Sequence, residues 1–255
     1  MLERLEKAPI IDTPGRDVRY HFLSFGWLVG GIVWLGLVSV IAGLISFEWF
    51  KLIQNSWPKA NAVFFTVAFF LMTALPYFPY YSVIVLGLVA AYAQNENKTL
   101  AFITGPYIAF PMACIWIIGA LSPLGMLWLA GVVWLTDTFA LIYGKTFGGP
   151  KLAPSISPNK TWSGLLGGIF GAIVVTGAFK YFDPATPMAL FGWAALISVV
   201  GQAGDLFESK YKRKFGVKDS GRMIPGHGGV LDRMDSFLFA APVMWALLAS
   251  GLITF

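Results

Sequence analysis

Charged residues are scarce in this chain of 255 residues. Asp, Glu, Lys and Arg together make up 12% of the sequence, whereas hydrophobic residues make up 57%. Soluble domains carry about 25% charged residues, so this chain has too few charges to cover the surface of a soluble globule. We therefore expect lipid to surround most of the molecule, and we expect no nucleic-acid partner.

Cysteine and histidine are also rare, with one cysteine and two histidines in the chain. A lone thiol excludes an internal disulfide, and Cys114, which lies in an apolar run, is expected simply to pack there. A single histidine in the polar part of the sequence, His227, is too few for a zinc site. The first 21 residues lack the basic region followed directly by an apolar run that marks a cleaved signal peptide. We therefore expect the membrane segments themselves to direct insertion.

Long apolar runs dominate what is present. A helix rises 1.5 Å per residue and the hydrocarbon core is about 30 Å thick, so one span needs about 20 residues. The sequence predicts an all-α, polytopic integral membrane protein with about eight transmembrane helices, and seven to nine also fit the pattern. Two prolines predict a tight turn at 76–81, and the glycines of 164–173 predict close helix packing. The predicted spans lie near 25–47, 60–77, 79–94, 101–120, 124–143, 164–182, 188–207 and 236–254.

The predicted organisation is a polar N-terminal tail, 1–24, followed by one transmembrane domain, 25–255, with polar loops at 144–163 and 205–235. With eight spans, the side of the membrane that holds these loops carries thirteen Lys and Arg residues, and the other side carries five. The richer side is expected to be cytoplasmic. The tail would then lie outside with four basic residues, and one span more or fewer near the N-terminus would move it inside.

Carboxylates gather in the last part of the chain. Asp137 and Asp205 lie in apolar surroundings, where a carboxylate is costly and is usually paired or functional. Asp232 and Asp235 are three residues apart and share one face of a helix, as do Asp205 and Glu208. Like charges on one face repel unless a cation lies between them or one group is protonated. Oxygen ligands of this kind suit Mg²⁺. Alternatively, Asp235 pairs with a lysine and Asp232 caps a helix.

Glycines and basic residues complete the polar segment. Consecutive N–H groups of the glycine-rich stretch 225–229 can hold a phosphate, and Lys212 and Lys218 supply positive charge nearby. Basic residues beside a membrane also serve to hold anionic lipid head groups, and His227 could simply organise the loop. A second stretch, SPNKTW at 157–162, runs into the next span, where helix N–H groups and the lysine could meet phosphate.

The long stretch SKYKRKFGVKDSGRMIPGHGGVLDRMD (209–235) resembles the signature of the phosphatidate cytidylyltransferase (CDP-diacylglycerol synthase) family. That signature has a serine, two basic residues, Lys-Asp, a small residue, His-Gly-Gly and Asp-Arg-x-Asp at fixed spacings. Tyr211 stands where the family usually has an aliphatic residue or Phe. The resemblance covers the second half well and the first half only by its spans. Further blocks resemble the family in the same order at 137–148, 151–164 and 204–209, and more weakly at 47–52.

The resemblance implies that CTP and phosphatidic acid react to give CDP-diacylglycerol and pyrophosphate, in phospholipid biosynthesis at the cell (inner) membrane. It also implies Mg²⁺, with room for a second, monovalent cation, membrane lipids as surroundings, a homodimer and an active site that faces the cytoplasm. The chemistry suits these residues, because a phosphate monoester with a second pKa near about 6 is already largely a nucleophile at neutral pH. The main task is then to bring two anions together, which calls for a metal ion and lysines.

The resemblance also suggests roles for single residues. Asp205 and Asp232 are expected to bind the metal, and Asp235 and Asp219 come next, as ligands or as residues that orient the others. The expected catalytic residues are Lys160, Lys212, Lys218, Asp219, His227 and Asp235. The expected nucleotide-binding residues are Ser157, Lys160, Gly228, Gly229 and Arg233.

Three alternatives use the same residues differently. A CTP-dependent lipid kinase or a cytidylyltransferase for another lipid phosphate would share the nucleotide and the metal. An ion-coupled transporter would use Asp137 and Asp205 to carry ions, but it would not need the polar segment 209–235.

Overall fold

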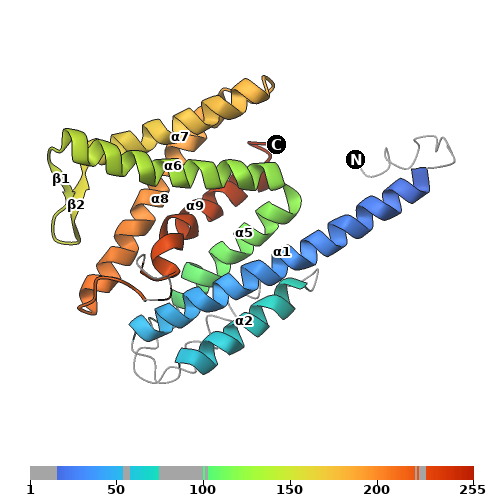
Figure 1. Cartoon of the computed structure of the whole chain (residues 1–255), viewed down its shortest axis with the longest axis horizontal. Coiled ribbons are helices and arrows are strands. Elements are labelled where there is room, and N and C mark those ends of the chain that lie inside the picture. The colour runs from blue at the N-terminus through green and yellow to red at the C-terminus, as the bar shows by residue number, and fades with distance from the viewer. Residues whose placement is uncertain (1–15, 54–57, 75–99, 101–102, 222, 224–227) are drawn as a thin grey trace.

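The computed structural model describes residues 16–53, 58–74, 100, 103–221, 223 and 228–255. The predicted span 79–94, the predicted turn 76–81 and His227 lie outside these residues. The helices of the described part, drawn in Figure 1, are α1 (Arg16–Leu52), α2 (Pro58–Ala74), the π-helical η2 (Gly105–Ala109), α5 (Phe110–Leu121), α6 (Pro123–Phe147), α7 (Trp162–Phe182), α8 (Ala189–Lys214) and α9 (Leu231–Ala249). Two strands, β1 (Lys151–Ala153) and β2 (Ser157–Thr161), form one antiparallel pair.

Helices occupy each predicted span that falls on described residues. Within the described part, four helical segments are long and apolar enough to cross a membrane: Gly31–Leu52, Pro123–Phe147, Trp162–Phe182 and Ala189–Lys214. The largely helical membrane class therefore agrees with the sequence, whereas the number of eight spans stays a prediction. The division into a tail and one transmembrane domain also stays a prediction, although α1 already begins at Arg16, inside the predicted tail.

Helix α8 runs to Lys214, well past the predicted end at 207. The added turns are polar, so an apolar pattern could not find them. Glu208 and Lys212 form an ion pair one helical turn apart, which stabilises a helix. Basic residues in the last turn also interact favourably with the negative end of the helix dipole.

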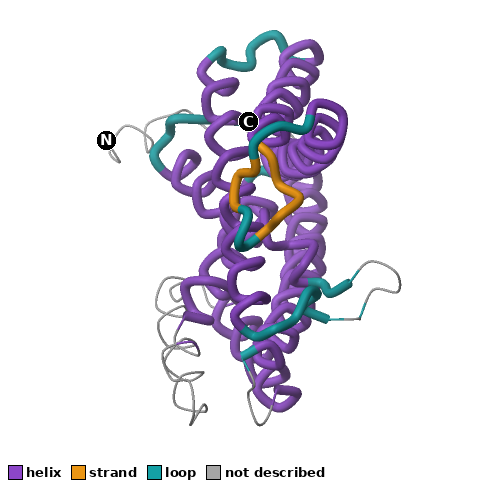
Figure 2. Tube along the Cα trace, turned by 90° about the vertical axis from the view of Figure 1, so that its left-hand side faces the viewer, coloured by secondary structure: helices purple, strands orange, loops and turns teal. Residues whose placement is uncertain are grey.

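The β-hairpin lies where the sequence predicted only a polar loop. Lys151 pairs with Thr161 and Ala153 with Ser157, and the hairpin leads directly into α7. The Thr161 hydroxyl accepts a hydrogen bond from the N–H of Gly164 and so caps the helix. Figure 2 shows the hairpin on the face of the molecule that is turned toward the viewer.

Glycines let the helix backbones approach closely. A Cβ atom on Gly171 of α7 would lie 2.5 Å from the carbonyl oxygen of Leu135 in α6, and one on Gly164 would lie 2.9 Å from that of Ala140. The close packing predicted for 164–173 is therefore confirmed. Helices α8 and α9 meet in the same way, since a Cβ atom on Gly204 would lie 2.6 Å from the carbonyl oxygen of Asp235.

A buried tryptophan fixes the end of α1 against the rest of the bundle. Trp49 is fully buried, and its Nε1 donates to Thr104 Oγ1 at 3.0 Å. Its ring lies 4.9 Å from that of Tyr107 and 5.5 Å from that of Tyr211 in α8. Tyr211, the departure from the family pattern, therefore makes an apolar contact that holds α1 beside α8.

Two alanine substitutions in α7 should differ in their effects on stability. Gly171→Ala should destabilise the protein by on the order of 1 to 3 kcal/mol, because the added methyl group meets the α6 backbone. Gly177→Ala is the matched control, because its Cβ would make only an ordinary contact with Phe191. That substitution should be neutral or stabilising, as alanine favours helix over glycine. Thermal denaturation in detergent measures both, and equal shifts of the melting temperature would contradict the packing described here.

Candidate functional site

The two polar loops predicted at 144–163 and 205–235 meet at one end of the helix bundle. Lys160 of β2 forms an ion pair with Asp205 of α8, with Nζ 2.5 Å from Oδ2, and also donates to the carbonyl oxygen of Gln202 at 3.4 Å. Arg213 Nε donates to the carbonyl oxygen of Ile156, between the two strands, at 3.4 Å. The expectation that these loops share one face is therefore supported by direct contacts.

Asp232, in the first turn of α9, is the most heavily bonded carboxylate of this region. Its Oδ1 lies 2.7 Å from Lys212 Nζ, and its Oδ2 accepts from the N–H of Gly229 at 2.7 Å. The N–H of Ser220 donates to both oxygens, at 3.2 and 3.1 Å. Burial alone would raise the pKa of Asp232, but the hydrogen bonds from Lys212, Gly229 and Ser220 hold its pKa below the usual range. Asp232 is therefore ionised at neutral pH.

Lys212 joins two acids that lie on different helices. Besides Asp232 it contacts Glu208 Oε2 at 3.3 Å, and the side chain of Glu208 is fully buried. Lys212 itself is only 11% exposed. A lysine in such surroundings keeps its charge because the two carboxylates face it.

The two glycines before α9 allow the chain to come close to Asp232. Gly228 has a φ of +86°, a conformation that favours glycine, and a Cβ atom there would lie 2.8 Å from Asp232 Oδ2. The N–H of Gly229 was expected to hold a phosphate, and in the structure it donates to Asp232. These glycines therefore build the site by shaping the backbone around a carboxylate.

The remaining acids lie near this pair but do not converge on one point. Asp205 accepts from Ser209 Oγ at 3.2 Å, and Asp235, which is buried, accepts from the N–H of Ser236 at 2.7 Å. Asp235 interacts electrostatically with both Asp205 and Asp137. Among the described residues, no three acidic, histidine or cysteine side chains are gathered closely enough to hold a metal ion together. The alternative expected a lysine beside Asp235, but in the structure it is Asp232 that meets a lysine.

A magnesium ion nevertheless fits the chemistry of these donors. The region holds more carboxylates than lysines. Asp205 and Asp232 already attract cations, since each lies against a lysine ammonium group, at 2.5 and 2.7 Å. Mg²⁺ needs only one or two protein carboxylates, because phosphate oxygens and water complete its coordination. Asp205 and Asp232 are suited to this role, whereas Asp235 is set back among buried residues of α9.

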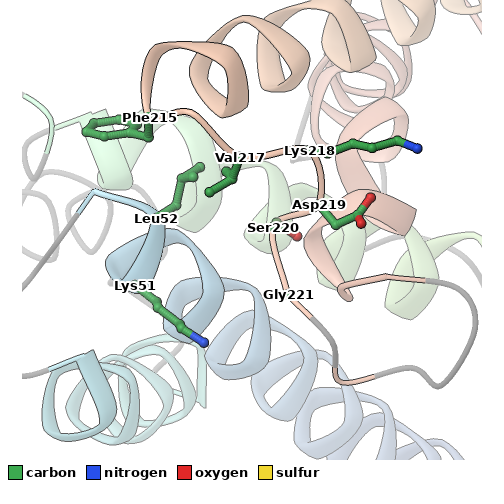
Figure 3. Close-up of a pocket in the computed structure, with 8 residues that line it drawn as sticks. All are labelled: Lys51, Leu52, Phe215, Val217, Lys218, Asp219, Ser220 and Gly221. Carbon is green, nitrogen blue, oxygen red and sulfur yellow. The ribbon is translucent and has the colours of Figure 1, made fainter.

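A pocket of about 590 Å³ is lined by Ser220, whose N–H donates to Asp232. Figure 3 shows Lys51 and Lys218 on different sides of it, with Asp219 next to Lys218. Ser220 therefore links the pocket to the site. Two cations next to apolar side chains suit an anion that also carries an apolar part. The lining residues are Lys51, Leu52, Phe215, Val217, Lys218, Asp219, Ser220 and Gly221.

Two further residues were expected to bind the nucleotide, Ser157 and Arg233. Ser157 is paired opposite Ala153 in the hairpin, and Arg233 is exposed in the first turn of α9, where it acts electrostatically on Asp137.

Sequence reasoning missed Glu48. This residue of α1 is 1% exposed, and its Oε2 accepts from the N–H of Leu231 at 2.8 Å and from Ser220 Oγ at 3.2 Å. The predicted first span ended at 47, which left Glu48 in a loop. An acid within an uninterrupted apolar helix was the signal, together with the weak resemblance at 47–52.

Comparison with known proteins agrees with this geometry. The chain matches the Cytidylyltransferase family over residues 20–250. It is 37% identical to the phosphatidate cytidylyltransferase of Rickettsia felis over 211 residues, which are 75% of this chain and 92% of the relative. It is 52% identical to that of Staphylococcus aureus over 119 residues and 50% identical to that of Brucella melitensis over 125 residues.

The last two alignments cover 46% and 45% of those relatives, so the chain spans about half their length. The family match, in contrast, runs from the first predicted span to the end of α9 and includes each helix that contributes to the site. On this match and on the contacts between Lys160, Asp205, Lys212 and Asp232, the chain belongs to the cytidylyltransferase family.

Proposed function

We propose that this protein is a phosphatidate cytidylyltransferase, which converts CTP and phosphatidic acid to CDP-diacylglycerol and pyrophosphate. One observation carries the proposal. The ion pairs Lys160–Asp205 and Lys212–Asp232 bring the segments that resemble the family, 151–164 and 204–235, together at one end of the bundle. The names of the Rickettsia and Staphylococcus relatives support the same activity.

The reaction requires a bond between a lipid phosphate oxygen and the α-phosphorus of CTP. The bond from that phosphorus to the bridging oxygen breaks, and pyrophosphate leaves with the electron pair. A phosphate monoester has a second pKa near about 6, so it can attack at neutral pH without a strong base. The protein therefore has to position the two anions and offset their charge.

Lysines held by carboxylates are suited to that task. Lys212 is fixed between Glu208 and Asp232, and Lys160 is fixed on Asp205, so both ammonium groups are positioned before a substrate binds. Asp205 and Asp232 would hold Mg²⁺, with Asp235 supporting them from within α9. When bound, the ion would offset the negative charge on the phosphates of CTP and on the leaving pyrophosphate.

The pocket lined by Lys51, Lys218 and Ser220 would receive a phosphate-bearing part of a substrate. Lys218 and Lys51 supply positive charge there, and Leu52, Phe215 and Val217 supply an apolar wall. Lys218 was expected at the site from the sequence, whereas Lys51 comes from the end of α1.

The proposal extends to the membrane setting. The long apolar helices support the assignment to a membrane, and the bacterial origin of the relatives supports a location in the inner membrane. The basic loops at the site are expected to face the cytoplasm, where CTP is found. A homodimer remains an expectation from the family. No contact in the described part favours an ion-coupled transporter.

The phosphorus that is attacked separates this activity from that of a lipid kinase. Attack at the α-phosphorus leaves cytidine on the lipid, whereas attack at the γ-phosphorus releases CDP. CTP labelled in the cytosine ring should therefore transfer its label to the chloroform-soluble fraction when phosphatidic acid is the acceptor. Label that stays water-soluble as CDP, while the lipid gains one phosphate, would identify a kinase.

Matched variants belong in the same assay. Asp232→Asn keeps the size of the side chain but removes its charge, so label transfer should fall by on the order of a hundredfold or more. Asp183→Asn, in the exposed connection between α7 and α8, is the control and should transfer label at the normal rate.

The orientation can be tested with single cysteines in a Cys114→Ala background. Ser155→Cys lies in the exposed turn of the hairpin, and Ala185→Cys lies in the exposed connection at the other end of α7. In intact spheroplasts a membrane-impermeant thiol reagent should label only Ala185→Cys. After permeabilisation both should react. Labelling of Ser155→Cys in intact spheroplasts would contradict a cytoplasmic active site.

A further inference from the structure

A carboxylate in the first helix is buried against the start of the last one. Glu48 is 1% exposed, although it lies only one helical turn before the end of α1. Its Oε2 accepts from the N–H of Leu231 at 2.8 Å and from the hydroxyl of Ser220 at 3.2 Å. Among the described residues it forms no ion pair with a lysine or arginine. In the described part of the chain, its donors are Ser220 and Leu231, both within the resembling segment 209–235.

The bond to Leu231 supplies a cap that α9 lacks in its own sequence. The first N–H groups of a helix have no partner within the helix, and a side chain usually accepts one of them. The residue at the N-cap position of α9, Val230, has no group that could do so. Glu48 takes this place from another helix, and its negative charge also lies at the positive end of the α9 dipole.

Glycines of the segment pack directly on Glu48. A Cβ atom on Gly221 would overlap Oε1 of Glu48, and one on Gly229 would overlap Oε2. Gly229 also donates its N–H to Asp232 at 2.7 Å. The α-carbon of Gly229 therefore packs against Glu48 while its amide bonds to Asp232, which leaves no space for a side chain at this position.

Ser220 connects the same two carboxylates. Its hydroxyl donates to Glu48 at 3.2 Å, while its N–H donates to Asp232 at 3.1 Å. Ser220 directly follows Lys218 and Asp219, which line the pocket. Any movement of Glu48 would shift Ser220, and with it the donors that set the orientation of Asp232.

We propose that Glu48 is a positioning residue, which fixes Ser220, Gly229 and the start of α9 so that Asp232 and Lys218 face the substrates correctly. The proposal rests on the proposed function and extends it to a residue outside the signature segment. Within the part of the chain that the structure describes, Glu48 has no ion pair with Lys51 or Lys218, so it acts through the backbone that it holds.

The test compares Glu48→Ala and Glu48→Gln with Ser46→Ala. Ser46 is buried on the same helix and donates within it, to the carbonyl oxygen of Ala42, so it controls for changes in α1. Two quantities are measured: hydrogen exchange of the amides in 216–235, which needs no activity, and the Mg²⁺ concentration that gives half-maximal transfer.

In Glu48→Ala the amides of 216–235 should exchange faster and kcat should fall. The half-saturating Mg²⁺ concentration should rise about tenfold or more, as it does when a residue that orients metal ligands is removed. Glu48→Gln keeps one acceptor oxygen and should show a smaller change in both. Ser46→Ala should behave as wild type. Should Glu48→Ala not fold, Glu48→Gln alone still decides, with a threefold or larger effect expected because bonds to a charged acceptor are roughly twice as strong.

Unchanged exchange in both Glu48 variants would overturn the proposal. Faster exchange with an unchanged Mg²⁺ requirement and kcat would also overturn it, because Glu48 would then only stabilise the fold. If wild-type protein transfers no cytidylyl group but exchange responds as expected, the proposed function is wrong while the contact between α1 and the signature segment stands.

Discussion

The pairing of Lys212 with Glu208 and Asp232 is the interaction on which the rest of the site depends. Lys212 lies between Glu208 of its own helix and Asp232 of α9, and all three side chains are largely buried. Removing this positive charge would leave Asp232 with only the N–H donors of Ser220 and Gly229, and would leave Glu208 without its lysine partner, in a poorly solvated region, which is unfavourable. The position of α9 relative to α8, and hence of every group attached to α9, is tied to this pair.

Close backbone contact makes that pair geometrically feasible. Gly204 lets α8 approach the α9 backbone at Asp235, and Gly171 and Gly164 do the same for α7 against α6. The α7 side brings Lys160 to Asp205, and Glu48 attaches the end of α1 to the start of α9. Glycines set the distances between the helices, and carboxylates and lysines form ion pairs between them. The proposed transfer of a cytidylyl group needs the close helix packing and the ion pairs.

The sequence predicted the parts of this site that depend on spacing. Asp205 and Asp232 were expected at one site because they flank the polar segment, and Lys212 was expected there as a phosphate-binding lysine. The structure joins Lys212 to Asp232 directly. The hairpin was not predicted, because a short polar stretch with prolines gives no strand pattern. Glu48 was missed because its partners are more than 170 residues away in sequence, and no local pattern reports such a contact.

The most direct test of this account is to locate a divalent ion and the nucleotide together. A crystal structure of the protein with Mn²⁺ and a non-hydrolysable CTP analogue would place the ion by its anomalous scattering. The account predicts an ion bonded to a carboxylate oxygen of Asp232 or Asp205 and to phosphate oxygens, with Lys160 and Lys212 beside the phosphates. An ion or nucleotide bound away from both carboxylates would contradict it.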